Sequence, residues 1–204
     1  MDECQSGICI GDATPRMTCK APPQRANRLI TDRTKESQDR ITLNMVRGPV
    51  TTAAEYEDPT TGSPDYHLCV YDSDSGQSLL KIDTIAPGGG TCKSGRPCWK
   101  RMGSASNPRG HNCVDADMTP DGLPRMKLTA GTAGRSQIMA SGKGENLILP
   151  GPITSDSYFV HDPSDTVQAV QDDGDCWSVS FSEARRNTSS VFSARCRTSG
   201  VRCS

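Results

Sequence analysis

Apolar and polar residues alternate in six short runs after residue 28. Alternation places every second side chain in a core and the others in water, which is the pattern of an antiparallel sheet. We therefore predict short antiparallel strands at these runs. The runs are Ile41, Leu43 and Met45; Tyr66, Leu68 and Val70; Leu80 and Ile82; Met126 and Leu128; Leu147 and Leu149; and Trp177, Val179 and Phe181.

Turn-forming residues separate these runs and support the same prediction. Gly, Pro, Asp and Ser gather there because they accept the backbone angles that tight turns require. No stretch of about a dozen residues keeps the apolar stripe of an amphipathic helix. The sequence thus predicts an all-β fold, an antiparallel two-sheet sandwich. The turn clusters lie at residues 62–65, 74–76, 87–90, 120–122, 142–144 and 172–175.

The cysteine content indicates how such a fold is stabilised. Hydrophobic residues make up only 33% of the 204 residues, so the core is small, but the chain contains ten cysteines. Disulfides can replace part of a core and persist in oxidising compartments, so we expect an extracellular or cell-surface protein. The local pairs Cys92–Cys98 and Cys196–Cys203 are predicted to form. Cys69 and Cys176, in two alternating runs, are predicted to form an inter-sheet bridge beside Trp177.

The first residues differ in character from the rest. Residues 1–20 contain three cysteines among Gly and Pro, and they are predicted to form a small cysteine-rich segment. Successive prolines favour an extended backbone, so residues 21–27 are predicted to be a linker before a sandwich domain at residues 28–204. No export signal or membrane span is visible at the start, and we expect Met1 to begin a fragment of a longer precursor.

Four spaced blocks carry a family resemblance. They are YHLCVYDSDSG at residues 66–76, APGGGTCKSGRPCWK at 86–100, MKLTAGTAGRSQIMASGKGENLILP at 126–150 and VQAVQDDGDCWSVSFSE at 167–183. In these blocks the chain resembles an uncharacterised family of secreted proteins from myxobacteria and their relatives. The N-terminal CQSGICIGD resembles the end of a cysteine-rich repeat of such proteins. The resemblance implies secretion but assigns no ligand and no catalytic residue.

A cationic loop is the main candidate for a binding site. Cys92 and Cys98 would tie a Gly- and Pro-rich turn followed by Trp99, and no acidic residue lies between Cys92 and Asp115. An aromatic side chain among cations suits an acidic sugar. Alternatively, Trp99 fills the core, as most tryptophans do. In that case the cations still form a local positively charged patch. The candidate binding residues are Lys93, Arg96, Trp99, Lys100, Arg101, Arg109 and His111.

Signs of catalysis and of metal binding are few. Asp72 and Asp74 before a glycine form a fragment of a calcium loop, so structural calcium is one hypothesis, with solvated turn residues as the alternative. The chain has three histidines and none lies in a hydrolase or zinc-protease motif. A secreted hydrolase or metal-dependent enzyme with a site near His111 or His161 is the rival hypothesis.

Charge narrows the choice of partner. With 23 basic and 24 acidic side chains the net charge is −1, so no global field recruits nucleic acid, and we expect no membrane insertion. The C-terminus is basic, and its arginines are interpreted as protection of a solvated edge strand. They are Arg185, Arg186, Arg195, Arg197 and Arg202. Our leading hypothesis is a non-enzymatic, secreted or cell-surface structural or adhesion module without a cofactor. Its expected partner is an acidic extracellular glycan or another surface protein.

Overall fold

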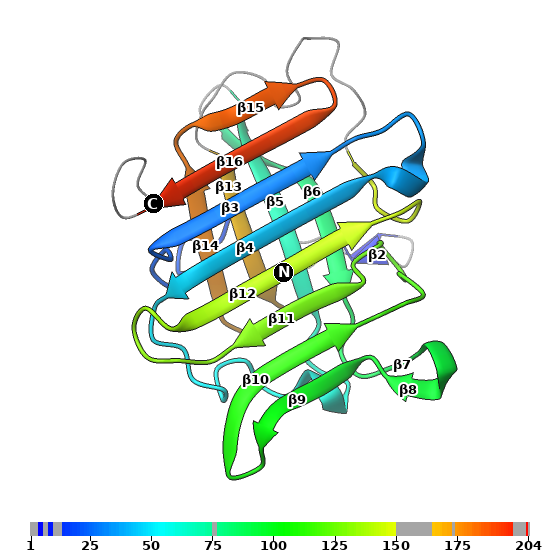
Figure 1. Ribbon diagram of the computed structural model, residues 1–204, viewed down its shortest axis with the longest axis vertical. Coiled ribbons are helices and arrows are strands. Elements are labelled where there is room, and N and C mark those ends of the chain that lie inside the picture. The colour runs from blue at the N-terminus through cyan, green and yellow to red at the C-terminus, as the bar shows by residue number, and fades with distance from the viewer. Residues whose placement is uncertain are drawn as a thin grey trace.

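The protein folds into two β-sheets that pack face to face (Figure 1). A computed structural model describes residues 4–5, 8–9, 14–74, 77–149, 165–172, 174–197 and 203. In these residues the only helical elements are the 3-10 turns η1 (Glu36–Gln38), η2 (Pro59–Thr61) and η3 (Lys93–Gly95). None of the described helical elements is long and apolar enough to cross a membrane. The prediction of an all-β, antiparallel two-sheet sandwich is confirmed.

The larger sheet has eight strands, all antiparallel to their neighbours. Their order is β15-β16-β3-β4-β12-β11-β10-β9, so β15 and β9 form the two edges. The strands are β3 (Arg25–Thr31), β4 (Arg40–Gly48), β9 (Trp99–Ser104), β10 (Asn107–Val114), β11 (Arg125–Thr129), β12 (Ser136–Lys143), β15 (Ala184–Thr188) and β16 (Val191–Arg197).

The smaller sheet has four antiparallel strands in the order β14-β13-β5-β6. Figure 1 shows them behind the larger sheet, crossing its strands. The strands are β5 (Tyr66–Asp74), β6 (Gln77–Ala86), β13 (Asp165–Gln171) and β14 (Cys176–Phe181). The described residues also form two small ribbons, β1 (Cys4–Gln5) with β2 (Ile8–Cys9) and β7 (Thr91–Cys92) with β8 (Arg96–Pro97).

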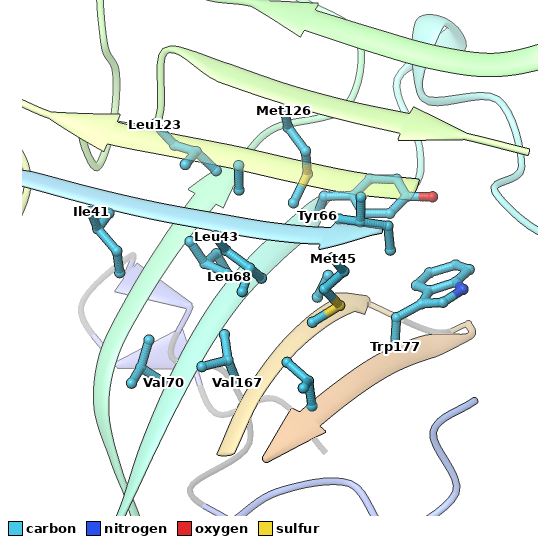
Figure 2. Close-up of a cluster of buried hydrophobic side chains, with 14 of the residues drawn as sticks. Ile41, Leu43, Met45, Tyr66, Leu68, Val70, Leu123, Met126, Val167 and Trp177 are labelled. Atoms are coloured by element: carbon cyan, nitrogen blue, oxygen red, sulfur yellow. The ribbon is translucent and has the colours of Figure 1, made fainter. Parts of the chain in front are cut away.

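The core lies between the sheets and consists of the residues that alternate inward. Figure 2 shows Leu43 and Met45 of β4 facing Leu68 of β5 and Val167 of β13. Trp177 closes one side, with its ring centroid 4.8 Å from that of Tyr56. Most of the predicted runs therefore point into the core as expected, because the period of two matches the pleat of a strand.

Two of the predicted runs differ from the structure. A bulge pairs Val70 with Ile82 but Tyr71 with Leu80, so Leu80 turns to the opposite face from Ile82 and packs near Cys69 and Tyr71. An extra residue in one strand reverses the alternation beyond it. Leu147 and Leu149 are not in a strand at all, although Leu147 is buried in the core.

A long-range disulfide fastens the N-terminal segment to the smaller sheet. Cys19 bonds to Cys176, across 157 residues, and the N–H of Lys20 donates to the carbonyl of Cys176 at 2.8 Å. The guanidinium of Arg16 donates to the carbonyls of Gln171 and Asp172 at 2.9 and 2.8 Å. The predicted linker is shorter than residues 21–27, because β3 begins at Arg25.

Candidate functional site

The predicted stapled loop forms at one edge of the larger sheet. Cys92 bonds to Cys98, and the ribbon of β7 and β8 pairs Cys92 with Arg96. The disulfide Cys92–Cys98 and the disulfide Cys196–Cys203 are both confirmed. Lys93 and Arg96 are exposed on this loop, and Lys100 and Arg109 are exposed on the following hairpin of β9 and β10.

Trp99 belongs to the core and cannot stack on a ligand. Its side chain is 1% exposed, and its indole N–H donates to the carbonyl of Pro87 at 2.8 Å. The ring lies 5.5 Å from that of Tyr66, centroid to centroid. Of the two interpretations of this residue, the core interpretation is confirmed, and it leaves the loop with cations but without an exposed aromatic ring.

Arg101 and His111 are engaged with Asp58 on the inner side of the same hairpin. The two residues are cross-strand partners, and the guanidinium of Arg101 contacts the Asp58 carboxylate. His111 is 3% exposed, with its Nε2 3.4 Å from Asp58 Oδ1. Burial lowers the pKa of His111, although the charge of Asp58 opposes this effect. His111 is therefore placed to fill space beneath the sheet and not to meet a partner in solvent.

The larger sheet presents a cationic face to solvent, which we call the basic face. It consists of the residues of the eight strands that alternate outward, opposite the core. One row of cross-strand partners on it runs Lys100, Asn112, Lys127, Met139, Asn44, Asn27 and Arg195. The cations of the basic face are Arg25, Arg40, Lys100, Arg125, Lys127, Lys143, Arg186, Arg195 and Arg197.

Charge is segregated between the two sheets. The eight strands of the larger sheet contain no aspartate and no glutamate. The four strands of the smaller sheet contain Asp72, Asp74, Asp83 and Asp165, and their only lysine or arginine is Lys81. The net charge of −1 is therefore a sum over a basic sheet and an acidic sheet that pack against each other.

Like charges face each other directly on the basic face. Arg25 is the cross-strand partner of Arg197, and Arg40 is the partner of Lys143. Partial desolvation and the charges of Arg197, Arg25 and Arg185 lower the pKa of Arg195. Directly opposed like charges destabilise a sheet, so folding alone does not explain this arrangement. β16 is also an interior strand, so the interpretation as protection of an edge strand is wrong for Arg195 and Arg197. Arg185 and Arg186 do lie on the edge strand β15, and Arg202 lies outside the described residues.

A histidine held between carboxylates occupies the outer side of the smaller sheet. His67 is 5% exposed; its Nδ1 lies 3.0 Å from Asp83 Oδ1 and its Nε2 lies 3.0 Å from Asp172 Oδ1. Burial would lower the pKa of His67, but the hydrogen bond to Asp83 and the charges of both carboxylates outweigh it and raise that pKa. Because both ring nitrogens are engaged, His67 is not placed to activate a nucleophile.

This network predicts pH-dependent stability. A raised folded-state pKa means that the stabilisation is fully present below the unfolded pKa of about 6.5 and is lost as pH rises through the folded value. We expect His67→Gln to lower the free energy of unfolding by about 2 kcal/mol at pH 6 and by less at pH 9. Urea unfolding of both proteins at the two pH values measures the difference. An equal loss at both values would contradict a charged His67.

Cys69 and Cys113 remain thiols, which corrects one predicted disulfide. Cys176 bonds to Cys19 and not to Cys69, because the N-terminal segment lies along β14. The thiol of Cys69 lies 3.8 Å from Asp83 Oδ1. Burial, with a smaller contribution from the charge of Asp115, raises the pKa of Cys113 to about 12. A buried thiol with a raised pKa is unreactive.

We expect both thiols to resist alkylation in the folded protein. Cys69 is 1% exposed and Cys113 is 2% exposed, so labelling by iodoacetamide should be slower than for a small free thiol by about 100-fold or more. Peptide mass mapping before and after unfolding in guanidinium chloride, without reductant, should show label on these two cysteines only after unfolding. Label on either one in the native protein would contradict the burial.

The predicted metal and rival catalytic residues are not brought together. Asp72 and Asp74 lie in β5, paired with Leu79 and Gln77, instead of in a calcium-binding loop. Within the described part of the chain, no group of three or more His, Cys, Asp or Glu residues is arranged to hold a metal ion. His161 lies outside the described residues.

Comparisons with known proteins leave the chain without an assigned family. No known protein family, curated protein or solved structure matches it significantly. The function must therefore be argued from the basic face itself. Sequence reasoning missed this face because its cations come from strands far apart in the chain. The local signs were the alternating pairs Arg125 and Lys127, and Arg195 and Arg197.

Proposed function

We propose that the protein is a secreted or cell-surface binding module that holds an acidic polysaccharide on the basic face. The observation that supports this best is the absence of any carboxylate from the eight strands of the larger sheet. A surface that serves only solubility mixes both signs of charge. A sheet with one sign of charge and directly opposed cations gains free energy when a polyanion neutralises it.

The dimensions of the face suit a long chain. Eight strands spaced by about 4.8 Å place the outer edges about 34 Å apart. Lys100 lies at one edge, on β9, and Arg186 at the other, on β15. A polymer that crosses the strands can therefore contact cations along its whole path, so many weak contacts add up to useful affinity.

A polysaccharide fits this face better than a nucleic acid does. Proteins that hold single-stranded nucleic acid stack bases on aromatic side chains, and no outward position of the eight strands is aromatic. The exposed apolar side chains on the face are instead Leu29, Val114 and Met139, which suit the apolar sides of sugar rings. Disulfides also favour an extracellular setting, where acidic polysaccharides occur.

Binding without catalysis agrees with the histidines. Both ring nitrogens of His67 face carboxylates, and His111 is buried beside Asp58. The thiol of Cys69 lies near the same carboxylate of Asp83 as His67, but this thiol is only 1% exposed. We therefore prefer a binding module to the rival secreted hydrolase or metal-dependent enzyme.

The wild-type protein can be tested directly for this function. We expect it to bind immobilised polygalacturonate and not neutral dextran, and to be released as the salt concentration rises, because exposed charges are screened beyond about 8 Å at 0.15 M salt. Equal retention on both matrices, or retention that salt does not change, would contradict the proposal.

A further inference from the structure

One part of the basic face is concave. A hollow of about 370 Å³ opens where strands β4, β11 and β12 meet the loop that follows β10. This volume lies within the range of sites that bind small ligands, roughly 300–1,000 Å³. Its lining residues divide into a cationic floor and a mostly apolar wall.

The floor of the hollow brings cations together from three neighbouring strands. Arg40 of β4 is the direct partner of Lys143 of β12, and Arg125 of β11 is the partner of Ser141, two residues from Lys143. In the described part of the chain, none of these three cations forms an ion pair with a carboxylate. The charges therefore converge around the hydroxyl-bearing Ser141 without being neutralised.

The wall supplies apolar contact and one carboxylate that is already occupied. Val114, which is 47% exposed, Met118 and Pro124 contribute the apolar surface. Asp115 also lines the hollow, but it is 7% exposed and accepts the backbone N–H groups of Asp117 and Thr119 at 2.9 and 3.0 Å. The carboxylate of Asp115 thus stabilises the turn of its own loop.

This wall is held in an unusual conformation. Met118 has a φ of 59°, a left-handed backbone angle that costs free energy for a residue with a side chain. Its carbonyl accepts the N–H of Gly122 at 3.0 Å and the side-chain amide of Asn146 at 2.9 Å. A wall fixed by such bonds loses little conformational entropy when a ligand docks against it.

We propose that this hollow is a subsite for one acidic sugar unit of the polysaccharide, an inference that rests on the proposed function. The carboxylate or sulfate group of the sugar pairs with Arg125, Arg40 and Lys143, because guanidinium groups bind such oxyanions through paired hydrogen bonds. The apolar side of the sugar ring packs on Val114 and Met118, and a ring hydroxyl reaches Ser141. The rest of the basic face holds the polymer by charge alone.

The test uses a short ligand that fills the hollow but cannot span the face. We compare trigalacturonate binding by the wild type, by Arg125→Ala/Lys143→Ala and by Arg25→Ala/Arg197→Ala. The last variant removes the same charge from the same face but about 20 Å away, since Arg25 pairs with Val46, six residues along β4 from Arg40. Thermal unfolding of each variant confirms that it is folded.

We expect the affinity for trigalacturonate to fall about tenfold or more for Arg125→Ala/Lys143→Ala and about twofold or less for the distant control. Backbone amide shifts in nuclear magnetic resonance should concentrate at residues 114–118. Equal losses in both variants, or shifts scattered over the face, would overturn the subsite. The proposed function would still stand if the wild type is retained on polygalacturonate. If the wild type binds neither trigalacturonate nor polygalacturonate, both the subsite and the proposed function are overturned.

Discussion

Replacing Cys19 and Cys176 together by alanine should lower the free energy of unfolding by about 5 kcal/mol, the largest stability effect we expect. The disulfide joins residues separated by 157 positions, and a cross-link restricts the unfolded chain more as the loop that it closes becomes longer. The loss is close to the whole stability of many domains. The double variant should therefore be unfolded or nearly unfolded at 37 °C.

The local disulfide provides the matched control for this prediction. Cys92 and Cys98 are separated by only six positions, so Cys92→Ala/Cys98→Ala should cost about 2 kcal/mol by the same argument. Guanidinium unfolding of both variants and the wild type measures the two losses. Equal losses would show that the long-range disulfide does not connect the N-terminal segment to β14 in solution.

Five of the twelve strands of the two sheets, namely β4, β5, β6, β11 and β14, were predictable from sequence because alternation is a local property of a strand. Ile41, Leu43 and Met45 of β4 point into the core as the pattern required. The pattern failed at Leu80, where a bulge reverses the alternation, and at Leu147, which enters the core from an irregular segment. Neither a bulge nor a buried loop leaves a periodic mark in a sequence.

Disulfide pairing was predictable only over short distances. Cys92–Cys98 and Cys196–Cys203 follow from the few residues between each pair, since a short loop brings its ends together. The partner of Cys176 depends on which segment lies beside β14, and that segment is residues 14–20 rather than β5. Tertiary packing alone decides this, so cysteine spacing could not.

The basic face was not predictable from sequence because it depends on strand order. Arg25 and Arg197 lie at opposite ends of the chain, yet β3 and β16 are neighbours and place them side by side. The loop tied by Cys92 and Cys98 was predicted as the binding site because its cations are close together in the sequence. In the folded protein Lys100 of that region is one end of a much larger cationic surface.

The second large effect concerns binding by this face. Arg25→Ala/Arg195→Ala/Arg197→Ala should weaken binding to polygalacturonate about 100-fold at low salt, since each lost contact to a charged partner costs about 1 kcal/mol. The same variant should unfold at a slightly higher temperature than the wild type at low salt, because the opposed cations no longer repel each other. Weaker binding with unimpaired stability distinguishes a binding role from a structural one.

The matched control removes cations that lie off the basic face. Arg33 and Lys35 lie in the turn between β3 and β4, close in sequence to Asp32, Glu36 and Asp39, and Lys81 lies on β6 of the smaller sheet. Arg33→Ala/Lys35→Ala/Lys81→Ala changes the net charge by the same amount. It should therefore reveal any effect of net charge alone on attraction to a polyanion.

The most direct test of a polysaccharide-binding face is the affinity of these three proteins for polygalacturonate, measured at several salt concentrations. We predict tight, salt-sensitive binding by the wild type and by the control variant. For Arg25→Ala/Arg195→Ala/Arg197→Ala we predict binding about 100-fold weaker, with a shallower dependence on salt because fewer charge contacts remain. If both variants bind like the wild type, or both lose affinity equally, the basic face is not the binding surface.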